Sequence, residues 1–72
     1  MSTREVAEAY LAQGSTVRAA ATMLNLIKTE PTTENLALLA DIYLEQGLFD
    51  DARELYLRVV KAGLNGESPK ES

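Results

Sequence analysis

The segment AEAYLAQG at residues 7–14 is repeated, with three changes, as ADIYLEQG at residues 40–47. The two segments share five identical residues when the chain is shifted so that residue 7 lies on residue 40. The same shift gives three further identities downstream: Ala19 with Ala52, Leu24 with Leu57, and Lys28 with Lys61. Self-similarity at a fixed spacing is typical of a chain built from copies of one structural unit.

Each copy has the pattern of a helical hairpin. Apolar residues recur three and four positions apart before Gly14 and again before Gly47, as in a helix with one buried face. Glycine supplies the left-handed backbone conformation that ends many helices, without a Cβ penalty. A second apolar stripe opens near Ser15 or Thr16 in the first copy and near Asp50 in the second. The sequence therefore predicts an all-α chain, with four helices in two stacked antiparallel hairpins.

Residues that favour helix ends agree with this division. Ser2 and Glu5 have the spacing of a capping box, and Thr32 or Thr33 can cap the helix that follows Pro31. We expect repeats at about residues 1–32 and 33–64, which together make one domain of residues 1–64. Residues 65–72 carry no apolar stripe, so we expect a flexible polar tail there.

The composition excludes several classes of function. The 72 residues include no Cys and no His, which removes disulfides, zinc sites and imidazole catalysis. No phosphate-binding loop or nucleophile motif is present, so we expect no enzyme activity, no cofactor and no metal. The net charge of −4 argues against nucleic acid as a partner. No apolar run approaches the length of a membrane helix or of a signal peptide, and we expect a cytoplasmic protein.

These residues resemble the tetratricopeptide repeat (TPR), a helical hairpin of about 34 residues. In the second copy the signature positions hold Leu36, Leu39, Ala40, Tyr43, Gly47, Ala52 and Tyr56. In the first copy they hold Val6, Ala7, Tyr10, Gly14, Ala19, Met23 and Pro31. The resemblance covers roughly residues 2–64 and implies a fragment of an α-solenoid. The pentatricopeptide repeats share the hairpin plan and bind RNA, but two acidic copies would hold a strand poorly.

The resemblance implies a protein-binding module, a scaffold or adaptor. In such arrays the first helices of successive hairpins line a concave groove that holds a peptide or partner helix. The residues that this places in the groove are Arg4, Glu8, Leu11, Asp41, Leu44 and Glu45. Because Glu8 and Asp41 occupy equivalent positions, we expect the groove to prefer a basic, amphipathic ligand; the alternative is a solvated acidic face.

The end of the stack is a second predicted surface. Arrays of this kind usually finish with a helix whose outer face is polar, and the residues after Gly63 cannot form one. We therefore expect parts of five residues to lie uncovered: Ile42, Leu55, Tyr56, Val59 and Val60. Uncovered apolar patches mark interfaces, so this end predicts a covering protein, a longer array, or a homodimer or higher oligomer.

Overall fold

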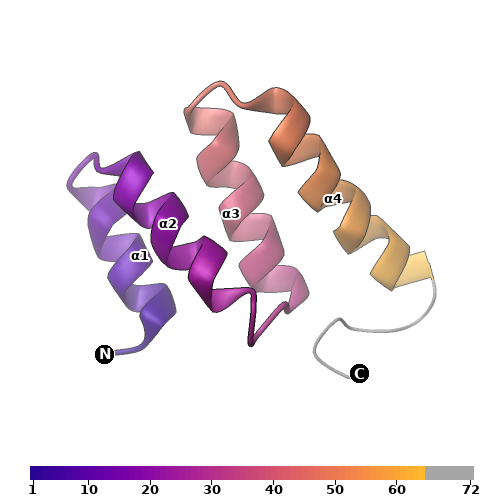
Figure 1. The fold of residues 1–72 in the computed structure, drawn as a ribbon, viewed down its shortest axis with the longest axis horizontal. Helices are drawn as coiled ribbons and strands as arrows, with labels where there is room; N and C mark the ends of the chain where they lie inside the picture. The colour runs from indigo at the N-terminus through magenta and orange to yellow at the C-terminus, as the bar shows by residue number, and fades with distance from the viewer. Residues whose placement is uncertain (65–72) are drawn as a thin grey trace.

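Four helices form two antiparallel hairpins in the computed structural model, which describes residues 1–64. The helices are α1 (Thr3–Ala12), α2 (Thr16–Leu26), α3 (Thr33–Glu45) and α4 (Phe49–Leu64). They lie side by side in chain order, each packed on the next (Figure 1). Residues 1–64 contain no strand, and the predicted all-α fold is confirmed. The tail expected at residues 65–72 lies outside the described residues.

The turns inside the two hairpins have the same structure because a glycine ends the first helix of each. Gly14 and Gly47 both have a φ of 79°, in the left-handed region that side chains disfavour. The amide that follows each glycine donates a hydrogen bond to the carbonyl oxygen of Tyr10 or Tyr43, at 2.8 Å in both turns. This pattern satisfies carbonyl groups that a helix end otherwise leaves unpaired.

Local polar contacts fix the starts of two helices. The Ser2 side chain accepts a hydrogen bond from the backbone amide of Glu5, and the Glu5 carboxylate accepts one from the Ser2 amide, which is the predicted capping box. Thr32 caps α3 by accepting a hydrogen bond from the Asn35 amide at 3.2 Å. These contacts hold α1 and α3 at the starts that the sequence predicts.

The core is a layer of small and branched side chains between the helices. Tyr10 and Tyr43 are half-buried against it in equivalent positions. The alanines matched by the repeat are fully buried, and their small side chains allow helices to approach closely. The buried apolar residues are Ala7, Ala19, Ala20, Met23, Leu26, Leu36, Leu39, Ala40, Ile42, Ala52 and Leu55.

Two residues that were expected to lie uncovered belong to this core instead. Ile42 is 0% exposed and Leu55 is 7% exposed, so the prediction of exposure was wrong for both. The reason is that α3 and α4 pack against one another within their own hairpin, and Ile42 and Leu55 belong to the buried core cluster. Of the other residues named for this end, Tyr56 and Val59 are half-buried and Val60 is exposed.

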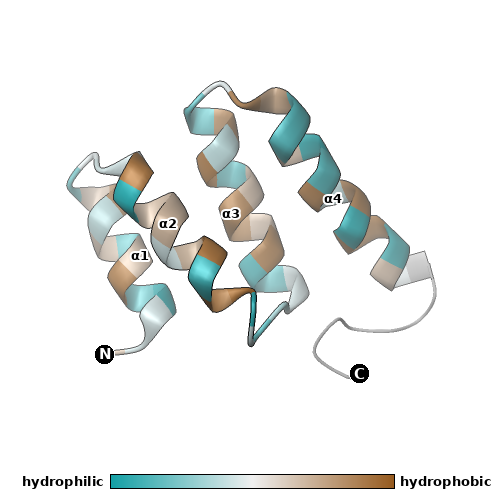
Figure 2. Cartoon of the chain, in the orientation of Figure 1, coloured by the Kyte–Doolittle hydropathy of each residue, from teal (hydrophilic) through white to brown (hydrophobic). Residues whose placement is uncertain are grey.

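The helix at the end of the row, α4, mixes polar and apolar residues along its length. Figure 2 shows hydrophilic and hydrophobic segments alternating along the whole of α4, which lies at one end of the row of helices (Figure 1). Each helix within residues 1–64 is too short or too polar to pass through a lipid bilayer.

Candidate functional site

The exposed face of α3 is acidic and carries an apolar strip. Glu34, Asp41 and Glu45 are exposed and lie seven and four residues apart, a spacing that places them on one side of the helix. Leu44 is exposed beside them, and Ala37 is half-buried. Asp41 and Glu45 therefore place negative charge directly beside exposed apolar carbon on this face.

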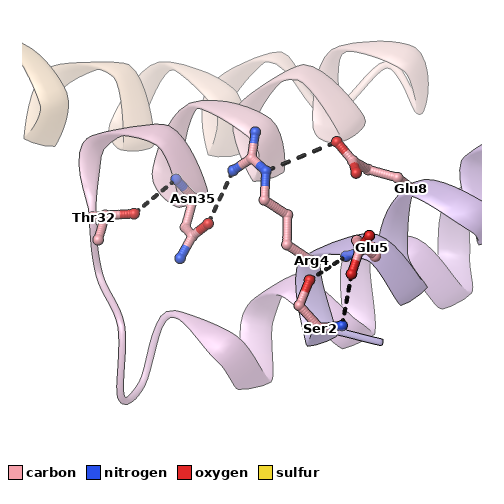
Figure 3. Close-up of polar contacts among 6 residues, drawn as sticks. All are labelled: Ser2, Arg4, Glu5, Glu8, Thr32 and Asn35. Atoms are coloured by element: carbon pink, nitrogen blue, oxygen red, sulfur yellow. Dashed lines mark hydrogen bonds and ion pairs between the residues drawn. The ribbon is translucent and has the colours of Figure 1, made fainter.

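On α1 the predicted groove residues pair with one another. Arg4 and Glu8 form an ion pair with Nε and Oε2 3.8 Å apart (Figure 3). An exposed pair at this spacing stabilises a helix by about 0.2–0.5 kcal/mol. Because the guanidinium group lies beside Glu8, this part of the surface is less acidic than the matching part of α3. Glu8 and Asp41, expected to act as a matched pair, therefore have different neighbours.

Arg4 also connects the two hairpins. Its Nη1 donates a hydrogen bond of 2.9 Å to Oδ1 of Asn35, which is 31 residues away in the chain (Figure 3). Asn35 is buried, and its Nδ2 donates a hydrogen bond of 2.9 Å to the carbonyl oxygen of Glu30. The Asn35 side chain, at the start of α3, is thus bonded both to α1 and to the segment before α3.

Sequence reasoning missed Asn35. The available signal was a polar residue directly before Leu36 in the apolar stripe of α3, at a position that helical spacing turns inward. A buried amide needs hydrogen-bond partners, and the partners here come from a different hairpin and from the connecting segment. Their positions could not be deduced from local pattern.

Asp41 receives a hydrogen bond from the hydroxyl group of Tyr56, which lies on α4. This bond raises the pKa of Tyr56, with smaller contributions from burial and from the negative charge of Asp41. Burial, and to a smaller extent Asp51, raises the pKa of Tyr43. The exposed carboxylate at the centre of the α3 face is therefore held by a neighbouring helix.

The two predicted apolar groove residues have different surroundings. Leu11 on α1 is half-buried and packs against the core, whereas its counterpart Leu44 on α3 is exposed. Of these two leucines only Leu44, which is 41% exposed, is accessible beside Asp41 and Glu45.

A second surface lies on the outer face of α4. A shallow hollow there is lined by Glu54, Leu57, Arg58 and Lys61. Phe49, Leu57 and Val60 are exposed on this helix, and only Val60 was among the residues predicted for this end. Phe49 and Leu57 could have been found from their spacing. They are separated by close to two helical turns, which places them on the same side of α4.

Acidic side chains do not gather into metal-ligand groups of three or more anywhere in residues 1–64. The two surfaces described above expose carboxylates and apolar carbon.

Comparison with known proteins agrees with this fold. Residues 10–68 match the model of the tetratricopeptide repeat family. A search of curated proteins and a search of solved structures each found no match. Members of this family typically mediate protein–protein interactions and are generally not catalytic. With four helices that fit two repeats and a match over most of its length, the chain belongs to the tetratricopeptide repeat family.

Proposed function

We propose that the protein is a non-catalytic scaffold or adaptor that binds a basic, amphipathic peptide or helix along the exposed faces of α1 and α3. The observation that carries this proposal is the acidic face of α3, where Asp41 and Glu45 lie beside exposed Leu44. The cytoplasm, where such domains are common, is the compartment that we propose for it.

The distribution of charge supports α3 as the centre of the binding surface. On α1 the charge of Glu8 is offset by Arg4, so a cationic ligand gains less there. Asp41 accepts the Tyr56 hydrogen bond, and this bond fixes the position of the carboxylate. A ligand helix with Lys or Arg on one side and an apolar anchor beside them complements Asp41, Glu45 and Leu44.

The proposal is tested with a synthetic helix-forming peptide that has Lys on one face and Leu on the other. Binding of the labelled peptide to the whole chain is followed by fluorescence anisotropy at low salt. Glu45→Lys should weaken binding by at least about tenfold, because it replaces an attraction by a repulsion. Added salt should weaken binding to the unsubstituted chain as well.

The matched control is Glu30→Lys, which makes the same charge change at an exposed residue outside the α3 face. Its affinity for the peptide should stay close to that of the unsubstituted chain. Equal losses for Glu45→Lys and Glu30→Lys would mean that only net charge matters and would overturn the proposal. So would equal affinity for a second peptide that keeps the Lys residues and lacks the Leu face.

A further inference from the structure

The outer face of α4 carries an apolar stripe that no described helix covers. Phe49 is 66% exposed, Leu57 is 47% exposed and Val60 is 53% exposed. Together with exposed Arg53 they follow one another at intervals of four, four and three residues. Such intervals place side chains along one side of a helix, with a spacing close to that of helices that pair through a narrow apolar seam.

The side of α4 next to this stripe also lacks a covering helix within residues 1–64. Buried residues of α2, which packs against α3, have counterparts on α4 that are exposed or half-buried, because no described helix follows α4. The matched positions are Ala20 with Arg53, Met23 with Tyr56, and Leu26 with Val59. The fold therefore covers this position in the first hairpin and leaves it uncovered in the second.

Charges along one flank of the stripe are segregated. Asp50 and Glu54 lie in the first part of α4, and Lys61 lies in its last turn. Intervals of four and seven residues place all three on the same side of the helix. They are exposed, and none of them forms an ion pair with another side chain of residues 1–64. Of the other charged residues of α4, Asp51 adds to the negative part and Arg58 to the positive part, while Arg53 lies within the stripe in the first part. The first part of α4 is thus negative on balance and the last part is positive.

We infer that this face binds the same face of a second copy of the chain, with the two α4 helices antiparallel. If the helices cross near Leu57, the last turn of one lies against the first turns of the other. Lys61 of each copy then lies near Asp50, Arg53 and Glu54 of the other, on both sides of the crossing. The two carboxylates outnumber the one guanidinium group, so the contact is attractive on balance. A parallel arrangement would instead bring like charges together and repel.

The separation of negative and positive charge along α4 favours a second copy of the chain as the partner that binds this face. A helix that is complementary to itself when reversed forms a two-fold interface in which each contact occurs twice. Leu57 and Val60 supply the apolar centre, and the charges fix the direction of the helices. This interface does not include Glu45 or Asp41, so it is independent of ligand binding on α3.

Sedimentation velocity of the whole 72-residue chain over a range of concentrations tests the pairing. The mass should rise from that of a monomer to twice that value as the concentration increases. Leu57→Glu should keep the chain monomeric over the same range, because it places a charge in the apolar centre. Val17→Glu is the matched control at a residue of α2 that is 72% exposed, and it should dimerise normally.

Circular dichroism should show that both variants keep their helices. A monomer at every concentration of the unsubstituted chain would overturn the inference. The face would then have to be covered by a different protein or by further repeats of a longer array. Equal dimerisation by Leu57→Glu and the unsubstituted chain would overturn it as well.

A charge exchange tests the direction of the helices. Lys61→Glu should weaken dimerisation by at least about tenfold, and addition of Glu54→Lys to the same chain should restore most of it. Failure of the double variant to recover would contradict the antiparallel arrangement. Glu45→Lys, which tests the α3 surface, should leave dimerisation unchanged, so each of the two proposals can fail without the other.

Discussion

The hydroxyl group of Tyr56 on α4 donates a hydrogen bond to the carboxylate of Asp41 on α3. The counterpart of Asp41 in the first repeat is Glu8, which pairs with Arg4 on its own helix. Equivalent carboxylates thus have unlike partners, one from the same helix and one from the next. The two repeats share a backbone plan and differ in surface chemistry.

Alkaline pH should destabilise the fold partly through this bond. The pKa of Tyr56 is raised above its usual 10.0 because the neutral phenol donates to Asp41. The stabilisation is therefore complete below the unfolded-state pKa and is lost as the pH rises through the raised value. The raised pKa of Tyr43 acts in the same direction. The midpoint of urea unfolding should be lower at about pH 11 than at about pH 9.

Tyr56→Phe should make this pH dependence smaller and, near neutral pH, should reduce the free energy of unfolding by about 1 kcal/mol or less. Tyr10→Phe is the control, since the Tyr10 hydroxyl has no hydrogen bond within the described residues. An identical pH dependence in Tyr56→Phe and the unsubstituted chain would show that the bond contributes nothing in solution.

The glycines in the two hairpin turns should tolerate no side chain. Gly14→Ala and Gly47→Ala should each cost about 1 kcal/mol or more, because φ at both positions is 79°. A Cβ would meet no atom within 4 Å at either position, so the cost arises in the backbone alone. Gly63→Ala, within α4, should instead stabilise the chain by about 0.5–1 kcal/mol. Thermal unfolding compares the three, and a stabilising Gly14→Ala would refute this account.

Removal of the Asn35 side chain should weaken the junction between the hairpins. Asn35→Ala removes the hydrogen bond to the Glu30 carbonyl and the one from the Arg4 guanidinium, which keeps its ion pair with Glu8, at an expected cost of about 1–3 kcal/mol. Asn25→Ala, at an exposed residue of α2, should change the free energy of unfolding by less than about 0.5 kcal/mol. Urea unfolding monitored by circular dichroism distinguishes them, and equal midpoints would show that the junction does not depend on Asn35.

Leucines on the two sides of α3 should differ in their contribution to stability. Leu39 is fully buried, so Leu39→Ala should cost about 2–5 kcal/mol through lost burial and a cavity. For a chain of this size that is a large part of the total stability. Leu44→Ala removes the same atoms from an exposed position and should change stability by less than about 0.5 kcal/mol. A similar thermal midpoint for both variants would contradict the assignment of the core.

Features that depend on neighbouring residues could be predicted from the sequence. The positive φ at Gly14 and Gly47 follows from the glycine at the end of each apolar stripe, and the Ser2–Glu5 capping box follows from spacing within one turn. Helical periodicity also identifies the inward side of α3, which holds Leu36 and Leu39. Each of these is decided within a few residues of the chain.

Features that depend on distant residues could not be predicted in the same way. Helical periodicity places Ile42 and Leu55 on the apolar sides of their helices. It does not show that the packing of α3 on α4 buries both of them. The Arg4–Asn35 hydrogen bond joins residues that only the packing of one hairpin on the next brings together. The half-buried state of Tyr56 likewise depends on packing between hairpins, because its counterpart Met23 is buried in the first hairpin, where α3 packs against α2.

The contact between Arg4 and Asn35 gives a periodic chain a fixed order. The counterpart of Arg4 in the second repeat is Ala37, and the counterpart of Asn35 in the first is Ser2. A chain with its two hairpins exchanged would keep the matched alanines and tyrosines, yet it would place no guanidinium group beside an amide at the new junction. One polar contact therefore makes the first hairpin and the second non-interchangeable.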